Sequence, residues 1–164
     1  MAGLTRTLIW ESPEDAAALG RRLALLMPES GVSSLFLRGP LGSGKTTLAN
    51  ALVKALPGGG MAEAGSPSFS VCHHYPTTPP VLHCDLYRCR TNPPDELLDG
   101  LENPALLCIV EWADFLPANC RPPESLDMDM ELCDKGRILR LQAHGRCAAR
   151  LLDALCEKGL SAQA

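Results

Sequence analysis

Gly39-Pro-Leu-Gly-Ser-Gly-Lys-Thr46 is the stretch of sequence that decides the fold of this chain. The distance from its first glycine to the Gly-Lys-Thr triplet matches the Walker A motif. An apolar segment, residues 32–38, precedes the motif, and a helix-forming segment, residues 45–56, follows it without interruption. A strand before the loop and a helix after it are the context in which this motif binds phosphates. The chain is therefore predicted to be a P-loop nucleotide-binding protein.

The residue types of the motif suit a triphosphate. Glycines let the backbone fold into a tight loop whose N–H groups point inward at anionic oxygens, and the following helix directs its positive end to the same point. Lys45 supplies a cation to the β- and γ-phosphates, and the Thr46 hydroxyl is an oxygen ligand for Mg²⁺. A chance match is the alternative, but at average residue usage it occurs in only about 0.5% of chains of this length. Binding of a nucleotide with Mg²⁺ is therefore expected.

Strand and helix patterns alternate along the rest of the chain. Ser12 and Pro13 begin a helical segment that is predicted to end before Pro28. Further strands are predicted over residues 68–75, 81–88, 106–110, 127–132 and 138–143, and further helices over residues 93–101, with Asn92 as cap, and 147–158. This order predicts an α/β fold for residues 1–164: a single P-loop NTPase domain with a mostly parallel sheet flanked by helices and an antiparallel C-terminal hairpin.

The composition narrows the classes of protein to which the chain can belong. Its 164 residues are 46% hydrophobic and carry a formal net charge of −4. That length and apolar content suit one domain with its own core. No apolar run approaches the roughly 20 residues of a membrane span, and the N-terminus lacks a signal-peptide pattern, so no membrane association and a cytoplasmic location are expected. Without a basic stripe, the chain is not expected to bind nucleic acid tightly by itself.

The cysteines are expected to be reduced thiols that pack as small hydrophobic side chains. No two of them form a Cys-x-x-Cys pair, and no zinc-binding spacing of Cys and His is present. Several stand within apolar runs, which favours a structural role over a disulfide or a metal site. The eight positions are 72, 84, 89, 108, 120, 133, 147 and 156.

Two acidic residues in predicted strands are candidates for the chemistry beside the P-loop. Glu111 ends the apolar run 106–110, and Asp85 lies in the predicted strand 81–88, where the period of two places it on one face with Val81 and His83. Nucleotide hydrolysis needs a carboxylate near Mg²⁺ and a positioned water molecule. Acids at the carboxyl ends of strands next to the loop can supply both functions. The sequence leaves open which of the two is the main metal ligand.

Two other classes of nucleotide-binding protein lack support. The chain contains neither Asn-Lys-x-Asp nor Asp-x-x-Gly, the guanine-reading and switch elements of regulatory GTPases. Arg88 and Arg90 are too few for the arginine-rich lid of a small-molecule kinase. An ATPase is the leading interpretation. A non-hydrolysing, ATP-dependent interaction switch and a small-molecule kinase remain as alternatives.

Four segments, in this order, resemble a known family: the P-loop, Ser66-Pro-Ser-Phe69, His83-Cys-Asp-Leu-Tyr-Arg88 and Val110-Glu-Trp112. Together they resemble the TsaE (YjeE) family, the bacterial ATPases of threonylcarbamoyladenosine tRNA modification, over about residues 10–143. The resemblance implies a P-loop domain that hydrolyses ATP with the partner proteins TsaD and TsaB, in order to reset their complex between turnovers. Those partners transfer a threonylcarbamoyl group to the adenosine beside the anticodon, so this chain would meet tRNA only indirectly.

The resemblance also implies roles for single residues. Catalysis would involve Lys45, Glu111 and Asp85, with Asp85 orienting the water or linking to a moving segment. Mg²⁺ would be held by Thr46 and Glu111. The nucleotide would be bound by the P-loop residues and by one arginine of the C-terminal hairpin, namely Gly42, Ser43, Gly44, Lys45, Thr46, Thr47 and Arg137.

Ser66 and Ser68 match a segment that senses the γ-phosphate in the family. The family's usual Ser-Pro-Thr is Ser-Pro-Ser here, and Pro40 and Ser43 replace the usual Asp and Ala at variable P-loop positions. For Tyr87 and Trp112, packing and stacking on the nucleotide both remain possible roles.

Overall fold

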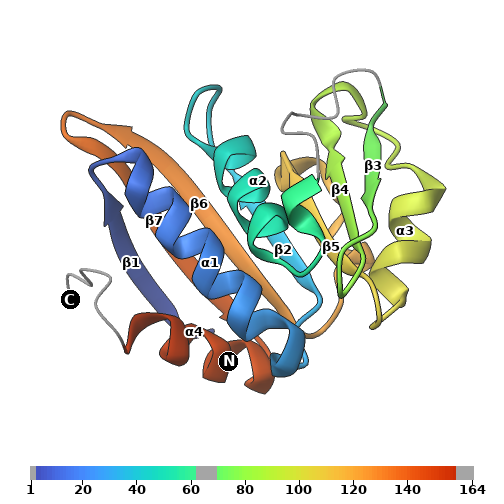
Figure 1. The fold of residues 1–164 in the computed structure, drawn as a ribbon. Helices are drawn as coiled ribbons and strands as arrows, with labels where there is room; N and C mark the ends of the chain where they lie inside the picture. The colour runs from blue at the N-terminus through green and yellow to red at the C-terminus, as the bar shows by residue number, and fades with distance from the viewer. Residues whose placement is uncertain (1–2, 62–69, 158–164) are drawn as a thin grey trace.

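A seven-stranded mixed sheet forms the centre of the molecule, in the order β1-β7-β6-β2-β5-β4-β3 (Figure 1). The computed structural model describes residues 3–61 and 70–157. β4, β5, β2 and β6 are mutually parallel neighbours, whereas β7 runs antiparallel to β6 and to β1, and β3 antiparallel to β4. The predicted α/β domain with a parallel centre and a C-terminal hairpin is confirmed. The strands are β1 Thr5–Trp10, β2 Ser34–Arg38, β3 Cys72–Tyr75, β4 Val81–Asp85, β5 Leu107–Glu111, β6 Ser125–Cys133 and β7 Gly136–His144.

Helices cover both faces of the sheet and divide the core into two clusters. α1 (Pro13–Ser30), α2 (Lys45–Ala55) and α4 (Arg146–Cys156) pack on one face, and α3 (Asp95–Glu102) packs on the other. Successive side chains of a strand point to opposite faces, and β2 shows the result. Leu35 and Leu37 join the cluster under α1 and α2, whereas Phe36 joins the cluster under α3. Within the described ranges, no helix has the length and hydropathy of a membrane span.

Helix α1 runs three residues beyond its predicted end. Its first turn is stabilised by the Asp15 carboxylate, which accepts hydrogen bonds from the backbone N–H groups of Glu11 and Ser12, at 2.7 and 3.0 Å. Pro28 does not stop the helix but lies in its last turn. The helix ends at Ser30. The next residue, Gly31, caps it with a φ of 80°, a left-handed conformation that residues with a side chain adopt less easily.

Other boundaries were also predicted incorrectly for local reasons. β1 was not predicted at all. β4 ends at Asp85 rather than at residue 88, because the Asp85 carboxylate accepts a hydrogen bond from the Tyr87 N–H and starts a short 3₁₀ turn. α3 begins after Pro94 rather than after Asn92. The first two residues of the predicted strand 68–75 and the end of the predicted helix 147–158 lie outside the described residues.

Cys72 and Cys84 form a disulfide between β3 and β4, so the expectation that all eight cysteines are reduced was wrong for this pair. The reason is strand register: the two residues stand directly opposite each other in the antiparallel ladder, with their Cα atoms 4.1 Å apart. The other six cysteines are free. Among them, Cys108 is fully buried, and burial raises the pKa of its thiol to about 12.

Gly20 allows α1 and α2 to approach closely. A Cβ at this position would lie 2.5 Å from the Ala51 Cβ and 2.7 Å from the Ala51 carbonyl carbon. We therefore expect Gly20→Ala to lower the free energy of unfolding by about 1–3 kcal/mol, because overpacking outweighs the higher helix propensity of alanine. Urea denaturation measures this difference. An unchanged or higher midpoint for the variant would show that the two helices do not pack in this way.

Candidate nucleotide site

The loop between β2 and α2 has a backbone that only glycine adopts easily. Gly39, Gly42 and Gly44 have φ values of 145°, 76° and 103°. A Cβ on Gly39 would also lie 2.4 Å from the carbonyl oxygen of Met130. The loop leads into the N-terminus of α2 at Lys45, where the first N–H groups of a helix have no partner within the helix. Together, the loop and the helix end form a concave backbone surface suited to an anion.

Lys45 is held over this loop. Its side chain is buried, and its ammonium group donates hydrogen bonds to the carbonyl oxygens of Gly39 and Pro40, at 2.6 and 2.9 Å. The same Nζ atom lies 4.3 Å from the centroid of the Trp112 ring. Burial lowers the pKa of Lys45, and the negative charges of Glu111 and Asp85 oppose that shift. The ammonium group is therefore placed where loop carbonyls, an aromatic ring and acidic residues meet.

Thr46, Glu111 and His83 form a chain of hydrogen bonds next to the loop. The Thr46 hydroxyl lies 2.9 Å from both carboxylate oxygens of Glu111, which is buried at the end of β5. The Nε2 atom of His83, on the neighbouring strand β4, lies 2.8 Å from Glu111 Oε1. A hydroxyl and a carboxylate are the hard oxygen ligands that Mg²⁺ prefers, so this pair fits that ion.

Asp85 lies at the same edge of the sheet as Glu111. The two residues are partners in the parallel register of β4 and β5, and each ends its strand. Of the two, Glu111 is the acid that accepts a hydrogen bond from Thr46, whereas Asp85 accepts one from the Tyr87 N–H, at 2.9 Å. The structure thus brings Lys45, Glu111 and Asp85 together beside the P-loop. Their catalytic roles remain predictions.

An aromatic group borders Lys45. The ring of Trp112 lies against Tyr87 and Phe115, with centroids 4.9 and 6.2 Å away. Within residues 3–61 and 70–157, Trp112 is the only non-glycine residue with a positive φ, at 55°. This conformation is uncommon for a residue with a side chain, and it occurs immediately after β5. The aromatic rings therefore lie beside the phosphate loop, and stacking on a nucleotide remains a prediction.

Arg137 reaches the P-loop from the far end of the sequence. Its guanidinium group donates a hydrogen bond to the carbonyl oxygen of Gly42, at 3.0 Å. A cleft of about 220 Å³ lies between this arginine and the start of α1. It is lined by Trp10, Glu11, Ser12, Pro13, Ala16, Gly44, Thr47, Gly136 and Arg137. Of the predicted site residues, Ser66 and Ser68 lie outside the described part of the chain.

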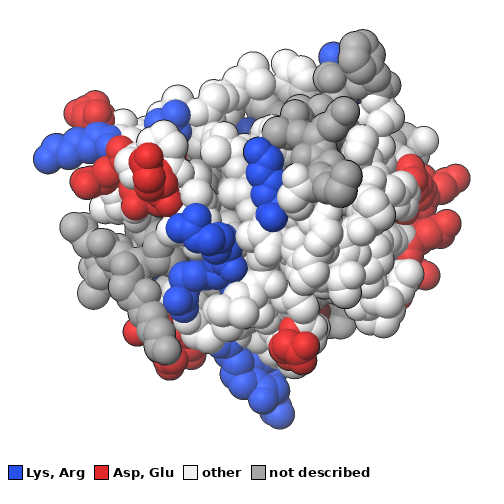
Figure 2. All heavy atoms as spheres, in the orientation of Figure 1, with Lys and Arg blue, Asp and Glu red and all other residues white. Residues whose placement is uncertain are grey.

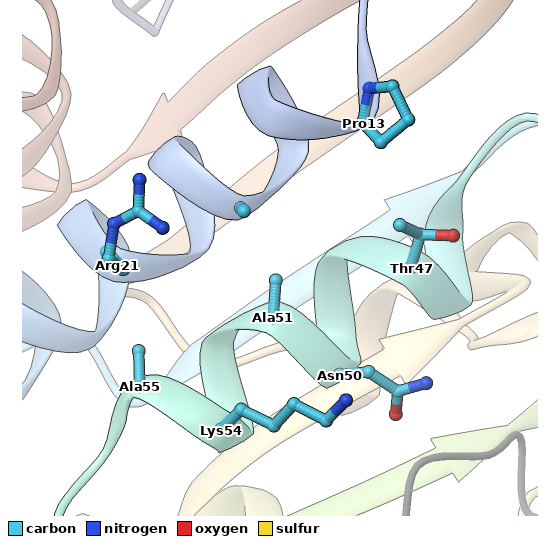
Figure 3. A pocket seen from close by; sticks show the side chains of 8 residues that line it. Pro13, Arg21, Thr47, Asn50, Ala51, Lys54 and Ala55 are labelled. Carbon is cyan, nitrogen blue, oxygen red and sulfur yellow. The ribbon is translucent and has the colours of Figure 1, made fainter.

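A second hollow of about 550 Å³ follows the contact between α1 and α2 (Figure 3). Thr47 lies near one end of it, close to the P-loop, and Lys54 lies toward the other end of α2. Figure 2 shows that basic side chains gather over α1 and α2 on this face, with acidic side chains mostly toward its margins. A chain with a net charge of −4 therefore still presents basic side chains along α1 and α2 on this face.

His83 and the ring of Trp112 are the parts of this site to which sequence analysis gave no defined role. The period of two in β4 places His83 on the same face as Asp85, and this signal was available in the sequence. Its contact with Glu111 depends on the pairing of β4 with β5, which no local pattern specifies.

The chain is similar to several known proteins. Residues 10–139 match the family model described as "Threonylcarbamoyl adenosine biosynthesis protein TsaE". A relative described as "tRNA threonylcarbamoyladenosine biosynthesis protein TsaE" from Mycobacterium leprae is 32% identical over 76% of this chain and 81% of its own. The Aquifex aeolicus protein of the same description is 41% identical, and that match spans 52% of this chain and 63% of the relative. The crystal structure of YdiB from Bacillus subtilis has the same fold, with a TM-score of 0.65, 24% identity and coverage of 94% and 95% of the two chains.

Proposed function

The chain belongs to the TsaE family, and from this we propose that it is a Mg²⁺-dependent ATPase that acts in threonylcarbamoyladenosine modification of tRNA. The observation that carries the proposal is the contact of Thr46, in the first turn after the P-loop, with the buried Glu111 carboxylate at 2.9 Å. A phosphate cradle alone supports binding. A cradle with a hydroxyl and a buried acid beside it also supports metal-assisted hydrolysis.

The loop and its surroundings support the proposal that the chain binds ATP. The inward N–H groups of residues 42–47 would bind the phosphate oxygens, and the Lys45 ammonium group would move from the carbonyls of Gly39 and Pro40 to the β- and γ-phosphates. The cleft between Arg137 and the start of α1 continues from the same loop and would hold the nucleoside. In this arrangement the γ-phosphate would lie near Glu111 and Asp85.

Thr46 and Glu111 would hold Mg²⁺, directly or through water. When bound, the ion neutralises phosphate charge and polarises the phosphoryl group. The side chain of Asp85 stands next to Glu111 in the sheet, where a carboxylate can accept a proton from an attacking water molecule and hold that water in line. Arg137 donates a hydrogen bond to a carbonyl of the loop and would gain a phosphate or ribose as an additional partner.

The partners would be TsaD and TsaB. Arg137 lies near the loop, but its hydrogen bond is with the loop backbone and not with the Glu111 side of the site. Slow intrinsic turnover is therefore expected, because arginine-assisted phosphoryl transfer is typically faster by three to five orders of magnitude. An acidic chain that acts on a partner complex does not itself need to hold tRNA.

We expect purified TsaD and TsaB to raise the ATP turnover of this chain at least 10-fold. The reason is that a partner can order the site or supply an arginine beside the γ-phosphate in addition to Lys45. Phosphate release, measured with each partner omitted in turn, tests this expectation. ATP-dependent assembly without any phosphate release would favour the interaction switch, and phosphoryl transfer to a metabolite would favour the kinase.

A further inference from the structure

We propose that His83 is a positioning residue that orients the Glu111 carboxylate toward Thr46 and the metal ion. The inference rests on the proposed function, because Glu111 matters for catalysis only if the site handles a metal-bound nucleotide. His83 itself would touch neither the nucleotide nor the metal ion. It would act through the hydrogen bond between its Nε2 atom and Glu111 Oε1, which is 2.8 Å long.

The contact determines which ring nitrogen carries the proton. A carboxylate only accepts hydrogen bonds, so Nε2 of His83 is the donor and a neutral ring has no proton on Nδ1. The Nδ1 atom is buried and has no hydrogen-bond partner within residues 3–61 and 70–157. The imidazole therefore has one polar contact in the described structure, and that contact is with the acid of the candidate site.

A purely structural explanation of His83 is weaker than a positioning role. The side chain is fully buried on strand β4, between residues such as Val81 that belong to the apolar core. A buried polar group with one unpaired nitrogen destabilises a fold relative to an apolar side chain of similar size. An apolar residue would therefore serve packing better, and the contact with Glu111 is what a histidine adds.

The hydrogen bond restrains the rotation of the Glu111 carboxylate. Glu111 ends β5, and its two oxygens are otherwise contacted only by the Thr46 hydroxyl among the described residues. With Oε1 bound to His83, both carboxylate oxygens lie 2.9 Å from the Thr46 hydroxyl. Groups that hold a metal ligand in place commonly affect metal affinity by 10- to 100-fold when removed.

The test compares His83→Leu, which removes the donor, with His83→Gln, whose side-chain amide can replace it. His73 supplies the matched control, because it pairs with His83 across the β3–β4 ladder but is exposed. The readouts are the affinity for Mn²⁺ in the presence of a non-hydrolysable ATP analogue, measured by electron paramagnetic resonance, and the Mg²⁺ dependence of partner-stimulated hydrolysis. Thermal unfolding of every variant reports structural damage.

We expect His83→Leu to weaken Mn²⁺ binding at least 10-fold and His83→Gln to restore it to within about 3-fold of the original chain. Affinity for the analogue without metal should change less than 3-fold, and His73→Leu should change none of these values. Equal metal affinity in His83→Leu and the original chain would overturn the proposal. So would a glutamine variant that is no better than the leucine variant.

Nitrogen-15 magnetic resonance of the labelled histidines provides a second readout that needs no hydrolysis. The proposal requires the Nε2-protonated form of His83, with a signal that shifts in Glu111→Gln. The Nδ1-protonated form would contradict it. If TsaD and TsaB fail to stimulate the original chain, the proposed ATPase function fails, whereas these metal-binding and resonance measurements still decide the role of His83.

Discussion

Lys45→Ala is expected to weaken ATP binding at least 100-fold and to reduce partner-stimulated hydrolysis to background. The Lys45 ammonium group lies buried over the loop, where the triphosphate would replace its present carbonyl partners. Removing one member of a buried, hydrogen-bonded charge pair typically costs about 2–5 kcal/mol, and 100-fold corresponds to about 2.7 kcal/mol. Calorimetric titration with Mg²⁺ and a non-hydrolysable ATP analogue measures the loss.

Lys54→Ala is the matched control for this substitution. Lys54 lies on the same helix, in the hollow beside α1, at the end away from the loop (Figure 3). Its removal should leave nucleotide affinity within about 2-fold, because an exposed charge that far from the loop is largely screened. If Lys45→Ala bound the analogue as tightly as Lys54→Ala, the loop would not be the phosphate site.

Glu111→Gln is expected to separate binding from hydrolysis. The glutamine side chain has the same shape, and its oxygen can still accept the Thr46 hydrogen bond, so the fold and the loop should be preserved. The negative charge that would hold Mg²⁺ is lost. We expect ATP affinity to change by less than about 5-fold and the turnover number with TsaD and TsaB to fall about 100- to 1,000-fold.

Phosphate release at increasing Mg²⁺ concentrations, together with nucleotide titration, measures both quantities. Glu102→Gln is the control, because this glutamate is exposed at the end of α3 on the opposite face of the sheet. It should leave turnover unchanged. Full turnover of Glu111→Gln would show that the Glu111 carboxylate is not needed for hydrolysis. Asp85 would then be the remaining candidate for the catalytic acid residue.

The parts of the fold that could be predicted from sequence depend on local pattern. The P-loop glycines mark backbone conformations that other residues adopt with difficulty, so Gly39 and Gly44 indicated both the strand before the loop and the helix after it. The alternation in residues 81–85 placed Val81 and Leu82 on opposite faces, as the two core clusters confirm. The apolar run that ends at Glu111 likewise predicted a buried strand with an acid at its carboxyl end.

The parts that could not be predicted depend on which strands become neighbours. The Cys72–Cys84 disulfide requires the register of β3 against β4, and the contact of His83 with Glu111 requires β4 beside β5. Arg137 meets Gly42 across 95 residues of sequence because β7 follows β6, which pairs with β2. The family resemblance implied that Arg137 approaches the nucleotide, but neither it nor periodicity predicted the contact with Gly42.

A crystal structure of the chain with Mg²⁺ and a non-hydrolysable ATP analogue tests whether residues 39–47 bind the triphosphate and Glu111 helps to hold its metal ion. The expected result has the β- and γ-phosphates within hydrogen-bond distance of the loop N–H groups and of Lys45. Mg²⁺ should then be bound to the Thr46 hydroxyl, with Glu111 as a ligand directly or through one water molecule. A nucleotide bound elsewhere, or a metal ion out of reach of both Thr46 and Glu111, would contradict the proposed site.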